Sequence, residues 1–129
     1  MDEMTNLPIL IVEDEPDVQE VLVELLLLKN FSSHVSYNAN EALAYLAKHT
    51  CNCAILDLSL PDMDGLSLFR TMRGTPSTAH IECVMITGFD SSVIRKNAKD
   101  AGCSAFLSKP IRERELLGHI EHIMTNLTK

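Results

Sequence analysis

Side chains that can bind a cation or a phosphoryl group lie at the ends of four apolar segments. Glu13 and Asp14 come directly after the first such segment, and Asp57 lies at the end of a second. A third segment is followed by the hydroxyl of Thr87, and a fourth by the ammonium group of Lys109. If the fold brings these segment ends together, three carboxylates, one hydroxyl and one ammonium group meet at one place.

The chemistry of such a group is specific. Carboxylates within a few ångströms repel one another unless a cation lies among them, and Mg²⁺ prefers oxygen ligands while keeping several waters. Lys109 supplies a positive charge for a phosphoryl oxygen, and Thr87 supplies a hydroxyl donor. Asp57 can act as a nucleophile, because carboxylates form aspartyl-phosphates. The residue types therefore indicate Mg²⁺-dependent phosphoryl transfer, which depends chiefly on positioning and charge neutralisation.

The apolar segments have the length and pattern of buried strands. Segments 7–12, 53–58 and 81–86 are apolar at nearly every position, and weaker strand signals lie at 33–37 and 104–108. Strands without alternation of apolar and polar residues are buried on both faces, as in a parallel sheet that helices cover.

The intervening segments have a helical period. The first carries one apolar stripe after Pro16, made of Val18, Val21, Leu22, Leu25 and Leu26. The second opens on a sequence that resembles a capping box, Asn38 to Glu41. Three further helices are predicted: 67–73 ended by Gly74, 91–101 with Asp90 as its cap and Gly102 past its end, and 112–127.

Five strands that alternate with five helices predict a doubly wound α/β fold. Such alternation implies right-handed βαβ units, and we expect the flavodoxin-like (βα)5 strand order 2-1-3-4-5 with helices on both faces. In that order, ligands bind at the carboxyl ends of strands 1 and 3. The five chemically active side chains are therefore expected on one rim of the sheet.

With these motifs in order, the sequence resembles the response regulator receiver family of two-component signalling over essentially its whole length. The resemblance is carried by four segments: Leu10-Ile-Val-Glu-Asp-Glu-Pro16, Leu56-Asp-Leu-Ser-Leu-Pro-Asp-Met-Asp-Gly65, Ile86-Thr-Gly88 and Phe106-Leu-Ser-Lys-Pro110. It implies a regulatory phosphoacceptor, not an enzyme in the usual sense. Asp57 would accept a phosphoryl group from a phosphohistidine on a sensor histidine kinase or a histidine phosphotransfer protein.

The resemblance also implies how Mg²⁺ would be held. Asp14 matches a direct metal ligand beside Asp57, and Glu13 matches a ligand that acts through water. The backbone carbonyl of Ser59 would be a further ligand. Glu13 stands where many relatives have aspartate, and it is a common variant there.

Other positions match the family's switch. Thr87 and Phe106 match its paired switch residues, and Lys109 matches its lysine, whose bond to the following proline is usually cis. Phosphorylation would then change the face formed by the helix 91–101, the strand 104–108 and the helix 112–127, where a downstream effector or a second copy would bind. Ser59 and Phe89 occupy variable positions that are expected to tune the lifetime of the phosphorylated form.

Length, composition and charge limit the number of domains, the kinds of partner and the cellular location. The chain has 129 residues, 46% of them hydrophobic, which predicts one receiver domain with a core of about 7–127. A net charge of −7 argues against a direct nucleic-acid surface. The longest apolar stretch is too short to span a bilayer, and the acidic start Met1-Asp2-Glu3 lacks the basic residues of a signal peptide, so a cytoplasmic location is expected.

Several alternatives are weaker. A haloacid dehalogenase-like phosphohydrolase needs a second acid two residues after its nucleophile, where this chain has Ser59. A pseudo-receiver lacks acceptor or metal residues that this chain keeps.

Two other groups of residues could bind a metal. Cysteines at 51, 53, 83 and 103 are instead expected to be buried free thiols, and His119 and His122 are expected on a polar helix face. The downstream output and the cognate kinase leave no trace in the sequence.

Overall fold

A computed structural model describes residues 7–127. The acidic start Met1-Asp2-Glu3, which bears on the signal-peptide prediction, lies outside the described residues. Strands and helices alternate strictly in these residues. The strands are β1 (Ile9–Val12), β2 (Ser33–Ser36), β3 (Cys53–Asp57), β4 (Glu82–Thr87) and β5 (Ala105–Ser108). The helices are α1 (Pro16–Leu27), α2 (Ala39–Leu46), α3 (Gly65–Arg73), α4 (Ser92–Ala101) and α5 (Glu113–Asn126). Each predicted element is present, and its ends differ from the prediction by a few residues.

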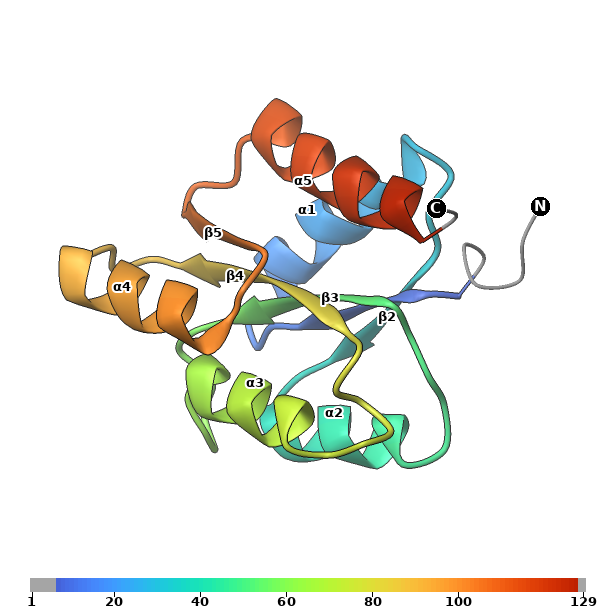
Figure 1. Ribbon diagram of the computed structural model, residues 1–129. Helices are drawn as coiled ribbons and strands as arrows, with labels where there is room; N and C mark the ends of the chain where they lie inside the picture. Colours follow the sequence, from blue (N-terminus) through green and yellow to red (C-terminus); the bar gives the residue numbers. More distant parts are fainter. Residues whose placement is uncertain (1–6, 128–129) are drawn as a thin grey trace.

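All strand pairs of the sheet are parallel, in the order β2-β1-β3-β4-β5, which confirms the predicted topology. The sheet lies between two helical layers, with α1 and α5 on one face and α2, α3 and α4 on the other (Figure 1). Parallel strands joined by crossover helices give this layered arrangement.

The residues of β1 explain why both faces are apolar. Leu10 and Val12 belong to the core under α2 and α3, whereas Ile9 and Ile11 belong to the core under α1 and α5. All four side chains are essentially inaccessible to solvent. The sheet therefore needs apolar residues along the middle of its central strands, as the sequence has, and polar residues occur in β3 and β4 only at the strand ends.

Short polar side chains cap three helices. The Asn38 carboxamide accepts a hydrogen bond from the Glu41 amide at 2.8 Å, as predicted, while the Glu41 carboxylate accepts one from the Tyr37 amide rather than from Asn38. Asp64 caps α3 in the same way, so this helix starts earlier than predicted. Capping oxygens satisfy amide groups that the first helical turn leaves unpaired.

The prediction that Asp90 caps the fourth helix is wrong. Ser91 caps α4 through a hydrogen bond from the Ile94 amide, and the Asp90 carboxylate instead binds Arg95 and Ser108. The cap side chain bonds an amide in the first helical turn, which favours the residue directly before the helix, and the two-pronged arginine bond competes for the aspartate. Gly102 ends α4 with a φ of 98°, the left-handed conformation that glycine adopts without steric cost.

Two further features agree with the sequence. The Lys109–Pro110 peptide bond is cis. Cys51, Cys53 and Cys83 are buried free thiols as predicted, and Cys103 is a free thiol that is partly exposed. Burial raises the pKa of the Cys51 and Cys103 thiols to about 11, which keeps them protonated and weakly reactive at neutral pH. Within residues 7–127, no helix is both long and apolar enough to cross a membrane.

Candidate functional site

The acidic residues and the lysine meet at the carboxyl ends of the strands. Glu13 and Asp14 follow β1 directly, and Asp57 is the last residue of β3. Thr87 is the last residue of β4, and Lys109 follows β5. The parallel register aligns these strand ends, because Asp57 pairs with Ile86 and Thr87 with Ser108. One rim of the sheet therefore carries all five side chains.

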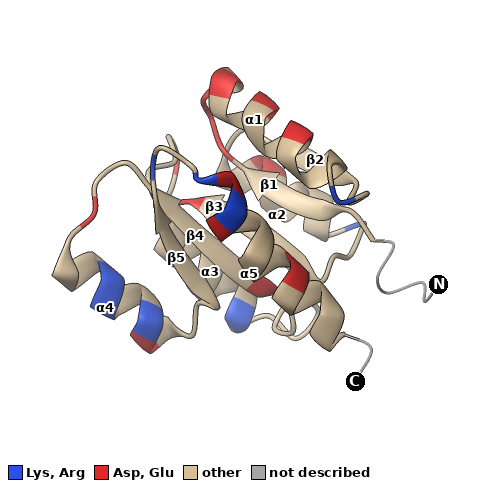
Figure 2. Cartoon of the chain, turned by 90° about the horizontal axis from the view of Figure 1, so that it is seen from above, with Lys and Arg blue, Asp and Glu red and all other residues tan. Residues whose placement is uncertain are grey.

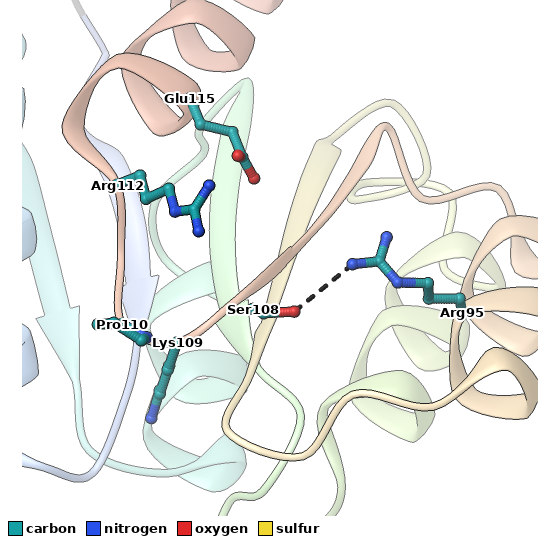
Figure 3. Close-up of a pocket in the computed structure, with 6 residues that line it drawn as sticks. All are labelled: Arg95, Ser108, Lys109, Pro110, Arg112 and Glu115. Carbon is teal, nitrogen blue, oxygen red and sulfur yellow. Dashed lines mark hydrogen bonds between the residues drawn. The ribbon is translucent and has the colours of Figure 1, made fainter.

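Lys109 contacts three carboxylates at once. Its Nζ atom lies 3.0 Å from Asp57 Oδ2, 3.0 Å from Glu13 Oε1 and 3.2 Å from Glu15 Oε1. The lysine comes from the loop between β5 and α5 and reaches back over β3 to the end of β1. In Figure 3 its side chain points away from Arg95 and Arg112, toward this rim. One ammonium group thus neutralises part of the acidic cluster.

The environment of each acid differs. The side chain of Glu13 is fully buried and that of Asp57 is 3% exposed, whereas Asp14 and Glu15 are exposed. The Glu13 carboxylate accepts a hydrogen bond from the Glu15 amide at 3.0 Å, and the Asp57 carboxylate accepts one from the Ser59 amide at 3.0 Å. The two buried acids are therefore held by backbone amides as well as by Lys109, whereas Asp14 and Glu15 face solvent.

Burial dominates the protonation of Glu13. It raises the pKa of this carboxyl to about 7, although the hydrogen bonds from the Glu15 amide and Lys109 oppose the change and the negative charge of Asp57 adds to it. Burial alone would lower the pKa of Lys109, but its contacts with Glu13 and Asp57 outweigh burial and raise it. Lys109 is therefore charged at neutral pH and belongs to the site as a permanent cation.

Four acids form a group with ligand atoms within 4.8 Å of one another: Glu13, Asp14, Glu15 and Asp57. Their oxygen chemistry fits Mg²⁺, which is held by few carboxylates and several waters. Glu15 was not predicted as part of this cluster, although its place beside Glu13-Asp14 was a signal. Figure 2 shows acidic residues at this end of the sheet and along α1, while α4 carries mostly basic residues.

The loop after Asp57 is held close to the acid. Asp62 accepts hydrogen bonds from the amides of Ala39 and Asn40, both at 2.9 Å, which ties the loop to the start of α2. The Gly65 amide donates to the Leu58 carbonyl at 2.8 Å. A Cβ atom on Gly65 would lie only 2.2 Å from the Asp57 carbonyl oxygen, so only glycine fits this approach. The tie and the glycine together set the position of Ser59.

The two predicted switch residues lie on neighbouring strands. Thr87 is buried, and its hydroxyl both accepts a hydrogen bond from the Phe89 amide at 3.0 Å and donates one to the Phe89 carbonyl at 3.1 Å. Phe106 is partly buried on β5, with the Arg95 guanidinium 4.9 Å from its ring centre. The Phe89 side chain is 73% exposed and points into solvent.

His119 and His122 take no part in this site. Both are exposed on α5, and a ring nitrogen of His122 lies 3.2 Å from the Asn126 amide nitrogen. Among residues 7–127, the acidic cluster at the rim is the group of side chains with metal-binding spacing.

One known protein family matches nearly the whole chain. The family model described as "Response regulator receiver domain" matches residues 9–121. This chain belongs to the response regulator receiver domain family. Members of this family are the receiving part of two-component response regulators, with a regulatory phosphoacceptor role rather than an enzymatic one in the usual sense.

Individual relatives agree. Response regulator MprA of Mycobacterium tuberculosis is 32% identical over 116 residues, which is 90% of this chain and 50% of MprA. An "uncharacterized 14.6 kDa protein in sodA1 3'region" of Leptolyngbya boryana is 28% identical, over 91% of this chain and 89% of that protein. The chain thus spans nearly all of the second relative and about half of MprA.

A solved structure supports the fold. The CheY-like receiver domain protein of Methanospirillum hungatei superimposes with a TM-score of 0.84 at 27% identity, covering 92% of this chain and 94% of that one. Receiver domains generally bind Mg²⁺ at an acidic pocket and receive phosphate from sensor kinases. The acidic cluster at the strand ends stands where the fold expects a ligand.

Proposed function

We propose that Asp57 is the phosphoacceptor of this receiver domain. The observation that carries the proposal is the position of the Lys109 ammonium, 3.0 Å from an Asp57 carboxylate oxygen that is otherwise buried. The other Asp57 oxygen is engaged by the Ser59 amide. A carboxylate held between two donors at the open rim of the sheet has the orientation that attack on phosphorus requires.

The reaction we propose is a transfer from phosphohistidine. An oxygen of Asp57 forms a bond to phosphorus while the phosphorus–nitrogen bond to the donor histidine breaks, and the imidazole leaves with the electron pair. Lys109 faces the developing negative charge on the phosphoryl oxygens, and fixed charges of this kind stabilise a transition state without reorganisation. The donor would be a sensor histidine kinase or a histidine phosphotransfer protein.

Mg²⁺ fits the remaining residues. Asp14 and Asp57 would bind it directly with the carbonyl of Ser59, and Glu13 would act through water. The ion would neutralise the charge of phosphate and acids together. Ligand oxygens of Glu13, Asp14 and Asp57 lie within 4.8 Å of one another, and Asp14 is exposed on the open side of this group.

The output we propose is a change at the face formed by α4, β5 and α5. Bonding of Thr87 to the phosphoryl group would break its two hydrogen bonds to Phe89 and would vacate space that Phe106 could enter. Phosphorylation would then shift a population of conformers rather than create a new one. A downstream effector or a second copy of the chain would read this face.

The test of the acceptor is labelling with acetyl phosphate in the presence of Mg²⁺. We expect base-labile, acid-stable incorporation of one phosphoryl group in the wild type and none in Asp57→Asn. Removal of Mg²⁺ with a chelator should abolish labelling of the wild type. Asp100→Asn, an exposed acid on α4, is the matched control and should label normally. Wild-type labelling in Asp57→Asn would refute the assignment.

A further inference from the structure

A second cluster of polar side chains lies beside the proposed switch. The Asp90 carboxylate accepts two-pronged hydrogen bonds from Arg95, from Nε at 2.8 Å and from Nη2 at 2.7 Å. It also accepts a hydrogen bond from the Ser108 hydroxyl at 2.7 Å. Figure 3 shows the Arg95 side chain reaching from α4 across a pocket toward Ser108 on β5. We name Asp90, Arg95 and Ser108 the Asp90 clamp.

The clamp joins three elements of the fold. Asp90 lies in the loop between β4 and α4, Arg95 lies on α4, and Ser108 is the last residue of β5. The hydrogen bonds from Arg95 and then from Ser108 hold the pKa of Asp90 below its ordinary value, so it is charged at neutral pH. The clamp is therefore intact under ordinary conditions.

The position of Arg95 has a consequence for Phe106. The guanidinium carbon lies 4.9 Å from the centre of the Phe106 ring, within the range of a cation–π contact. An exposed arginine normally samples many rotamers, and one exposed ion pair contributes little to stability. A two-pronged bond to a carboxylate instead selects one orientation of the planar guanidinium. The clamp thus keeps a flat cation over the Phe106 ring.

The same loop is bonded to Thr87. The Thr87 hydroxyl holds the backbone amide and carbonyl of Phe89, and Asp90 is the next residue along the chain. If Thr87 turns to a phosphoryl group, the Phe89 peptide groups lose both bonds and the loop that carries Asp90 is released. The clamp is thus connected to the phosphorylation site through one residue.

We infer that Asp90 is a positioning residue of the switch: it holds Arg95 against the Phe106 ring and so keeps the ring out of an inner position, the space beside Thr87, until Thr87 releases the loop. This inference rests on the proposed switch, because it concerns the side chain through which that switch acts. Removal of the clamp should favour the inner position of Phe106 before any phosphorylation. By linkage, the phosphorylated state should then form more readily, since the opposing state has lost a stabilising contact.

The chain offers a matched control. Lys96 and Asp100 form another ion pair on α4, with a nitrogen–oxygen distance of 2.9 Å and both side chains well exposed. Neither lies against an aromatic ring in the described residues. Asp100→Ala therefore removes one negative charge from α4 itself, ten residues after Asp90, without touching Phe106.

The experiment uses the whole chain labelled with ring-¹³C phenylalanine, whose four residues give few signals in a carbon–proton spectrum. Phe106→Leu identifies the Phe106 signal. Beryllofluoride with Mg²⁺ serves as the phosphoryl mimic, and its concentration for half conversion is read from the Phe106 signal. The proteins are the wild type, Asp90→Ala, Arg95→Lys and Asp100→Ala.

We expect Asp90→Ala to move the Phe106 signal, without beryllofluoride, toward its position in the saturated wild type. The half-conversion concentration should fall about threefold, the size expected for loss of one exposed charged contact. Arg95→Lys should give a smaller change in the same direction, because lysine keeps the charge but not the planar fork. Asp100→Ala should match the wild type.

Two outcomes would overturn the inference. One is an unchanged Phe106 signal and half-conversion concentration in Asp90→Ala. The other is an equal change in Asp90→Ala and Asp100→Ala, which would reduce the effect to the net charge of α4. A wild type that does not respond to beryllofluoride would instead count against the proposed function. The Phe106 signal without beryllofluoride would then decide the inference: a shift in Asp90→Ala that is absent from Asp100→Ala supports the clamp, and an unchanged signal in Asp90→Ala overturns it.

Discussion

Lys109 is the residue that connects the acids of the proposed phosphorylation site. Its ammonium group lies within 3.2 Å of oxygens from Glu13, Glu15 and Asp57, and two of those acids are buried. The sequence predicted Glu13 and Asp57 beside Lys109, because residues that follow parallel strands share one rim. It did not predict Glu15, because a residue just before a helix can point either to the rim or to solvent. Contacts between side chains decide that choice, and a strand pattern does not describe them.

Ser59 and Phe89 carry the first prediction at this scale, which concerns the lifetime of the phosphorylated form. Hydrolysis needs a water in line behind phosphorus, and neither the short Ser59 nor the exposed Phe89 offers an amide or a carboxylate to orient it. Loss of one orienting interaction slows a step roughly tenfold. The double variant Ser59→Asn, Phe89→Glu should therefore lose its phosphoryl group about ten times faster than the wild type.

The measurement is the decay of the phosphorylated form at saturating Mg²⁺, without a kinase or a phosphatase. Each single variant is the control for the other. A double variant that decays at the wild-type rate would show that these side chains do not set the lifetime.

At the scale of elements, the start of α3 determines where Asp57 lies. Gly65 approaches the Asp57 carbonyl so closely that a Cβ atom would lie 2.2 Å from the oxygen. Gly65→Ala must therefore shift the backbone of β3 or of α3. We expect it to destabilise the fold by about 1–3 kcal/mol, the usual cost of a forced backbone shift, and to slow labelling by acetyl phosphate.

Gly118→Ala is the matched control, because a Cβ atom on Gly118 in α5 would meet no atom within 4 Å beyond its chain neighbours and its own helix backbone. It should stabilise the protein by about 0.5–1 kcal/mol through helix propensity and leave labelling unchanged. Urea unfolding and the labelling rate measure both effects. If Gly65→Ala behaved like Gly118→Ala, the close approach would have no influence on the site.

The cap of α3 gives a prediction for pH. Burial raises the pKa of Asp64, but hydrogen bonds from Ser67 and the Leu66 amide, with the charge of Arg70, together outweigh burial and lower it below 3.8. Because the folded pKa is the lower one, the stabilisation is fully present above pH 3.8 and is lost as pH falls through the folded pKa. Asp64→Ala should cost about 1 kcal/mol at neutral pH.

That difference between Asp64→Ala and wild type should shrink when urea unfolding is repeated in increasingly acidic buffer. Asp17→Ala is the control. Asp17 is an acid in the first turn of α1, but the N-cap position of α1 is occupied by Glu15, so this variant removes a similar charge without removing a cap. A difference that stays constant down to the acid limit would show that the carboxylate charge does not contribute to the cap.

For the whole molecule, the sequence predicted the strand order and the rim because these follow from the alternation of buried strands with helices. It could not predict the tie between Asp62 and the start of α2, or the bonds between Asp90, Arg95 and Ser108. Both connect loops to distant elements, so they depend on how the layers pack and leave no periodic signal. The wrong assignment of Asp90 as a helix cap has the same cause.

The switch is a property of the whole molecule as well. Thr87→Ala removes the hydroxyl that bonds to Phe89 and, we propose, to the phosphoryl group. This variant should still be labelled at Asp57, but the signals of α4, β5 and α5 should no longer respond to beryllofluoride as they do in the wild type. Thr71→Ala is the control, since the Thr71 hydroxyl donates only to the Ser67 carbonyl on α3. Equal responses in Thr87→Ala and wild type would contradict the proposed coupling.

The central claim is that Asp57 forms the acyl-phosphate bond. The most direct measurement is reduction of the phosphorylated protein with borohydride, which converts an aspartyl-phosphate to homoserine, followed by peptide mass mapping. We predict homoserine at position 57 and unchanged aspartate and glutamate at positions 13, 14 and 15. Homoserine at Asp14, or an unmodified Asp57 in labelled protein, would contradict the account.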